Sequence, residues 1–118
     1  MGKIGTVQIT DGYHNIIREI EITDMVRSVY KDHRICSVAR TEENTFVLAV
    51  ENPESSGRHP KSQMHLSEDS MLGMVNAILL YYMHHGIDID KKMQSIVNSD
   101  TINFEYIDDT LEKDGKND

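Results

Sequence analysis

The first half of the chain alternates between apolar and polar positions, the pattern of strands that are covered on one face. The second half changes to the spacing of helices before a final alternating segment. Asp11-Gly12 supplies the turn chemistry of a hairpin between the first two strands. Strands are predicted over residues 4–10, 16–22, 34–40, 45–50, 62–66 and 101–107.

Three segments have the spacing of helices. Residues 24–30 place Met25, Val26, Val29 and Tyr30 on one helical face after Asp24 as an N-cap, which predicts a short helix. A long helix is predicted over residues 68–85, because Ser67 can cap its start and Gly86 can end it. A further short helix is predicted over residues 90–98.

The long helix is apolar around more of its circumference than one sheet face can cover. Between Met71 and Met83 only Gly73 and Asn76 are neither apolar nor aromatic. Either the short helix over 90–98 or the same helix of a second chain must cover the remaining side. We therefore predict a homodimer whose interface includes Leu72, Val75, Leu79, Leu80 and Met83.

These elements predict an α+β domain, an antiparallel sheet of five or six strands packed on one long C-terminal helix, with a short helix added. The 118 residues suffice for a single domain, which we place at residues 1–108. Residues 109–118 are polar and acidic, and we expect a disordered tail there. A membrane span and a secretion signal are not expected, which predicts a cytoplasmic protein.

Charge is distributed unevenly along the chain. The formal net charge is -8. Residues 1–61 hold 8 basic and 9 acidic side chains, a net of -1, whereas residues 62–118 hold 4 and 11, a net of -7. The acidity therefore belongs to the second half, and it is typical either of a solubilising surface or of one that competes for a basic partner.

The motifs that usually indicate catalysis are missing from the sequence. It has no phosphate-binding glycine run, no paired cysteines, no Gly-x-Ser-x-Gly and no His-Glu-x-x-His. His59 and His65 could share a metal ion with a carboxylate, but no spacing brings them together. The single cysteine, Cys36, lies in a strand pattern, where a buried inert thiol is expected. We predict a protein that is not an enzyme and that has no metal or cofactor.

A cluster of hydrogen-bond donors stands out against the acidic background. Arg58, His59 and Lys61 lie within four residues, beside Ser56 and Gly57. Such a loop could bind phosphate, although an ordinary solvated loop has the same composition. Strand arginines could extend the site across a sheet face, as in sheets that bind single-stranded nucleic acid. The predicted anionic-ligand site comprises Arg58, His59, Lys61, Arg18, Arg34 and Arg40.

One family resemblance concerns the order of elements. The segment TFVLAVENPESSGRHPKSQMHLS leads directly into the apolar helix EDSMLGMVNAILLYYMHH. Over residues 34–86 this order resembles the Whirly and transcriptional-coactivator group of folds that bind single-stranded DNA. The resemblance implies a curved sheet that binds the strand and a helix that forms the dimer. As a small acidic chain, the protein also resembles phage-encoded accessory proteins that inhibit a host factor.

Two functions follow from these observations. The first is a binding module for an anionic ligand, either single-stranded nucleic acid or a nucleotide. The second is an acidic inhibitor or regulator that docks on a basic surface of a protein partner. They predict opposite electrostatics, a basic sheet face for the first and a continuous acidic surface for the second.

Overall fold

The computed structural model describes residues 4–54, 56–57 and 60–108. The predicted tail at 109–118 therefore lies outside the described residues. The elements follow in the order β1 (Thr6–Thr10), β2 (Ile16–Tyr30), β3 (Ile35–Thr41), β4 (Phe46–Glu51), β5 (Lys61–Leu66), α1 (Glu68–His84), α2 (Ile89–Asn98) and β6 (Ile102–Asp108).

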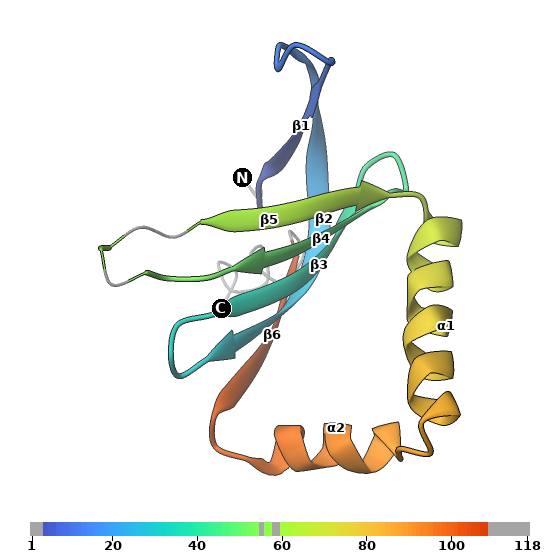
Figure 1. Cartoon of the computed structure of the whole chain (residues 1–118). Coiled ribbons are helices and arrows are strands. Elements are labelled where there is room, and N and C mark those ends of the chain that lie inside the picture. The colour runs from blue at the N-terminus through green and yellow to red at the C-terminus, as the bar shows by residue number, and fades with distance from the viewer. Residues whose placement is uncertain (1–3, 55, 58–59, 109–118) are drawn as a thin grey trace.

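The strands form a curled antiparallel sheet (Figure 1). Strands β1 to β5 are neighbours in sequence order, and β6 pairs with β2. The long strand β2 pairs with both the first and the last strand, because its first half pairs with β1 and its second half with β6. The β2–β3 register shifts between Ile22 and Asp24, as at a β-bulge, and bulges bend strands. An α+β chain with an antiparallel sheet of the predicted size is thereby confirmed.

The helix predicted over residues 24–30 is wrong, because β2 continues as a strand to Tyr30. Both edges of this segment are paired, one with β3 and the other with β6. A central strand carries apolar side chains on both faces, and two adjacent apolar pairs such as Met25-Val26 then imitate helical spacing. Two complete ladders of backbone hydrogen bonds outweigh a weak local preference for helix.

The small buried core lies on one face of the sheet, which we call the outer face. Val7, Ala39 and Val47 form its centre, with Ile9 and Met25 packed against them. Because Val7 and Ile9 come from β1, the β1–β2 hairpin is what covers this face. The opposite face, which we call the inner face, carries the side chains of Val26, Val38, Leu48 and Met64, aligned across four strands.

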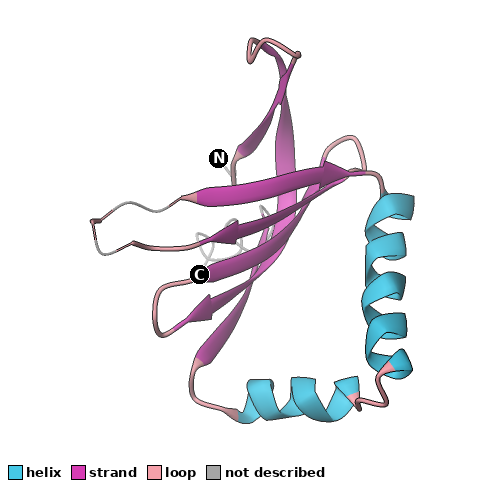
Figure 2. Cartoon of the chain, viewed as in Figure 1, coloured by secondary structure: helices cyan, strands magenta, loops and turns pink. Residues whose placement is uncertain are grey.

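The two helices form a frame beside the inner face and do not rest on it (Figure 2). The extensive contacts all lie between strands, and α1 makes few contacts with β5 and with α2. None of the residues of either helix is buried. The prediction of a sheet packed on one long helix is therefore wrong: the helices have 17 and 10 residues and leave the inner face open.

Local capping, by contrast, follows the sequence. Ser67 accepts a hydrogen bond from the backbone N–H of Ser70 at 3.2 Å, and Asp88 accepts one from Lys91 at 3.1 Å. Gly86 follows α1 with a positive φ of 65°, a conformation that glycine adopts without strain. Among the described residues neither helix is long and apolar enough to cross a membrane.

Candidate functional site

The inner face of the sheet is the floor of an apolar groove. Antiparallel register places Val26, Val38, Leu48 and Met64 in one row across β2, β3, β4 and β5. The adjacent row is more polar and consists of Ser28, Cys36, Val50 and Ser62. Cross-strand rows of this kind form a continuous surface because paired side chains share one face.

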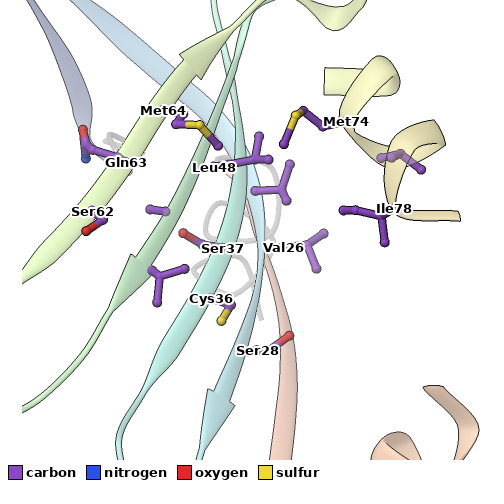
Figure 3. Close-up of a pocket in the computed structure, with 14 residues that line it drawn as sticks. Val26, Ser28, Cys36, Ser37, Leu48, Ser62, Gln63, Met64, Met74 and Ile78 are labelled. Carbon is purple, nitrogen blue, oxygen red and sulfur yellow. The ribbon is translucent and has the colours of Figure 1, made fainter. Parts of the chain in front are cut away.

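Helix α1 forms the wall opposite this floor. Met74 and Ile78 extend from α1 toward the strands, with Leu48 and Val26 facing them across the groove (Figure 3). The groove has a volume of about 610 Å³. Its walls remain accessible, since Val26 is 50% and Ile78 49% exposed. Ser67 positions this wall, because it caps α1 immediately after β5 ends.

The chemistry of the groove excludes several kinds of ligand. None of the described residues that line it carries a charge. Ser28, Cys36 and Ser62 supply its polar side chains from the inner face, whereas the side chains of Ser37 and Gln63 belong to the outer face by register. The described lining residues therefore include neither a cation that could pair with an anion nor an acid–base pair. An apolar occupant gains by leaving water, at about 25 cal/mol per Å² of apolar surface. The thiol of Cys36 is half-buried on this surface, in place of the buried position expected for it.

A polar cluster around Asp24 adjoins the groove on the inner face. The Asp24 carboxylate accepts hydrogen bonds from Thr23 Oγ1 at 2.8 Å, Tyr106 Oη at 3.1 Å and Arg40 Nε at 3.2 Å. Burial raises the pKa of Asp24. The hydrogen bonds and the Arg40 charge together lower it by more than burial raises it, so the pKa falls below its ordinary value. The hydrogen bond to Asp24 is the main reason that the pKa of Tyr106 rises to about 12. The carboxylate therefore stays ionised and joins β2, β3 and β6.

The sequence-predicted arginines are already engaged within the chain. Arg18 pairs with Glu43, and Arg40 pairs with Asp24. Arg34 pairs with Asp32 at 2.9 Å, and its guanidinium lies 4.2 Å from the centre of the Tyr30 ring. A fourth, Arg27, pairs with Glu105 at 2.7 Å. Each of the four arginines in the described ranges thus has a carboxylate partner.

The described members of the predicted anionic-ligand site lie at separate places on the sheet. Arg18 lies on the β1–β2 hairpin, whereas Arg34 follows the β2–β3 turn, close to the opposite end of β2. Arg40 lies between them on the inner face. Lys61 pairs in register with Glu51, in the row that includes Ile35, so it lies toward the Arg34 end of the sheet. Arg58 and His59 lie outside the described residues.

The predicted dimer residues on α1 are all accessible in the single chain. Val75 lines the groove, whereas Leu72, Leu79, Leu80 and Met83 are exposed on α1 without lining it. The sequence did not reveal the apolar row of the inner face, because Val26, which belongs to that row, was predicted to lie in a helix over residues 24–30. The unbroken apolar run over residues 46–50 does indicate a strand with apolar side chains on both faces, but it does not specify which face stays uncovered.

Of the two histidines considered for a shared metal ion, His59 lies outside the described residues. Nε2 of His65 lies 2.7 Å from Thr45 Oγ1 on the outer side of the sheet. Within the described part of the chain, no three histidine, cysteine or carboxylate side chains converge in a way that could hold a metal ion.

Comparison of the chain with family models, with curated proteins and with solved structures returned no match.

Proposed function

We propose that this protein is a non-enzymatic regulator that acts by docking on another protein chain through the groove between the inner face and α1. The observation that carries this proposal is the groove itself, an uncharged apolar hollow of about 610 Å³ whose walls are half exposed. Large accessible apolar surfaces on water-exposed domains mark sites of protein–protein contact.

The acidity of the chain indicates the kind of surface it can approach. Residues 62–108, which include both helices, hold two lysines and seven acids, a net of -5. Complementary charge speeds association and excludes like-charged partners. A protein partner that is apolar at its centre and basic around it fits this distribution.

The anionic-ligand function has less support from the contacts. An anion bound at Arg18, Arg34 or Arg40 would have to displace the carboxylate that each already holds. The loop with Arg58, His59 and Lys61 remains a predicted site for phosphate. The resemblance to the Whirly and coactivator folds also stays a prediction, as does a cytoplasmic location.

Peptide binding tests the docking proposal. Two fluorescent helical peptides with the same apolar face, one with basic and one with acidic flanks, are titrated with the protein and followed by anisotropy. We expect the basic peptide to bind more tightly and Val38→Asp to weaken it roughly tenfold. Ile17→Asp is the matched control, because Ile17 is exposed on β2 away from the groove and receives the same charge.

The same titration with a single-stranded oligonucleotide separates the two functions. Oligonucleotide binding that survives Val38→Asp, together with no binding of either peptide, would replace docking with the anionic-ligand function.

A further inference from the structure

Within residues 4–54, 56–57 and 60–108, two apolar surfaces lack a cover, and they belong to adjoining elements. One is the groove, with Val26, Val38, Val50 and Met64 on its floor. The other is the part of α1 that does not line the groove, where Leu72, Leu79, Leu80 and Met83 are between 40% and 70% exposed. At 100° per residue these four side chains point away from the direction of Ile78 by more than a quarter turn.

Together these surfaces have the size of a protein interface. Four exposed side chains on the sheet, three on the groove side of α1 and four on its other side make eleven, each at least 40% exposed. At roughly 150–200 Å² for a fully exposed large side chain, they present about 900 Å², against about 800 Å² per partner in a standard interface. A surface of this size indicates a second polypeptide.

We propose that the occupant of the groove is helix α1 of a second copy of this chain, and that two copies exchange their α1 helices reciprocally. This inference rests on the proposed function, because it names the protein chain that docks in the groove. The groove has apolar walls on two sides, so its occupant must be apolar around most of its circumference. Between Met71 and Met83, α1 has that property.

The dimensions of the groove suit a helix. A helix about 10 Å across that rises 5.4 Å per turn occupies about 420 Å³ per turn. The groove of about 610 Å³ therefore holds roughly one and a half turns. Because the groove is open at its ends, the remaining turns of a helix as long as α1 can extend beyond it.

Mutual insertion of the two α1 helices gives a finite dimer. In a two-fold dimer each copy gives one helix and receives one, so a single contact covers both the groove and the far side of α1 in each copy. A one-way insertion would leave one groove and one helix uncovered and would continue into a filament.

The charges of α1 are compatible with this arrangement. Glu68 and Asp69 begin the helix and His84 ends it, while no charge lies between Met71 and Met83. The part that enters the groove therefore carries no charge away from water, which would be costly without a partner. A two-fold axis across the helix pair makes the helices antiparallel, so the acidic start of one lies toward the histidine end of the other.

A disulfide trap tests the contact directly on the full chain. Cys36 is the only cysteine and lines the groove, so a second cysteine on the far side of α1 can meet it only across the interface. Leu72→Cys, Leu80→Cys and Met83→Cys are oxidised mildly and run without reductant. We expect at least one to give a covalent dimer of about 27 kDa, twice 13.5 kDa, that Cys36→Ser abolishes. Ile17→Cys is the matched control and should give no covalent dimer.

Light scattering of the unmodified chain gives an independent readout. We expect a mass of twice 13.5 kDa at concentrations of about 10–100 μM, and a monomer for Leu80→Glu but not for Ile17→Glu. If Leu80→Glu fails to fold, the disulfide trap still decides. A monomeric mass at every concentration overturns the inference, as does a dimer in which no α1 cysteine links to Cys36. A monomer that binds the basic peptide would retain the proposed function and overturn only the identity of the occupant.

Discussion

At the scale of single residues, Asp24 is the charged group on which the most strand contacts depend. Its carboxylate joins β2 to β3 through Arg40 and to β6 through Tyr106. Because its side chain is 23% exposed, water screens these contacts only in part. The depressed pKa of Asp24 means that its stabilising effect is present above the pKa of the unfolded chain and is lost as pH falls through the folded pKa.

We therefore expect Asp24→Asn to lower the free energy of unfolding by about 1 kcal/mol at neutral pH, or the melting temperature by about 4 °C. The difference should shrink as pH falls below about 4, where the carboxylate of the unfolded chain takes up a proton, and it should vanish once pH has fallen through the lower pKa of the folded chain. Thermal unfolding of both proteins across this range measures it. Glu43→Gln, which removes an exposed ion pair, should change the melting temperature little, and an Asp24→Asn effect that is independent of pH would contradict the account.

Thr41 is the one described polar residue that is almost completely buried, at 1% exposed. Its Oγ1 lies 2.7 Å from Thr45 Oγ1 and accepts hydrogen bonds from the backbone N–H groups of Glu43 and Thr45. Thr41→Val keeps the shape but leaves these groups without their partner. We expect a loss of about 1–3 kcal/mol in denaturant unfolding. Thr41→Ser keeps the hydroxyl and should lose clearly less; equal losses would show that packing of the methyl group is responsible.

At the scale of elements, most strands and the cap of α1 could be predicted from the sequence, whereas the length of β2, which includes the supposed cap Asp24, could not. Alternation located five strands to within a few residues and the first half of β2, because side chains on a half-covered sheet follow a period of two. The second half of β2 escaped this reading because β3 and β6, which pair with it, come from distant parts of the chain. The spacing of residues within a segment carries no information about strands from other parts of the chain that pair with it.

Of the two sides of the groove, only the α1 side could be predicted from the sequence. The apolar circumference of α1 indicated an uncovered helix, and the structure has no buried residue on it. The floor of the groove, including Val38 and Met64, depends on which face of the sheet the β1–β2 hairpin covers. That choice is made by the curl of the sheet, which the alternation of residues does not specify.

Helix α1 offers a prediction at this scale. Because none of its residues is buried within one chain, its stability depends strongly on its ends. Ser67→Ala removes the acceptor for the Ser70 N–H, and we expect a loss of about 1 kcal/mol with a lower helical signal in circular dichroism. Ser67→Asp keeps an acceptor and adds charge at the positive end of the helix, so it should retain the signal. Equal signals for Ser67→Ala and the wild type would show that other contacts hold the first turn.

At the scale of the whole molecule, the chain separates a covered outer face from an uncovered inner one. The core around Val7, Ala39 and Val47 is small for a domain of this length, and the apolar side chains of α1 and of the inner face lie outside it. A chain that keeps this much apolar surface accessible gains stability when another chain covers it. The central claim is that the inner face and α1 are covered together by a second copy of the chain.

Hydrogen exchange measured by mass spectrometry over a range of protein concentrations tests that claim most directly. The account predicts that peptides from residues 71–83 and from β4 and β5 gain protection together as concentration rises, while peptides from the β1–β2 hairpin do not change. Leu80→Glu should remove the concentration dependence. Rapid exchange of residues 71–83 at every concentration, as in an uncovered helix, would contradict it.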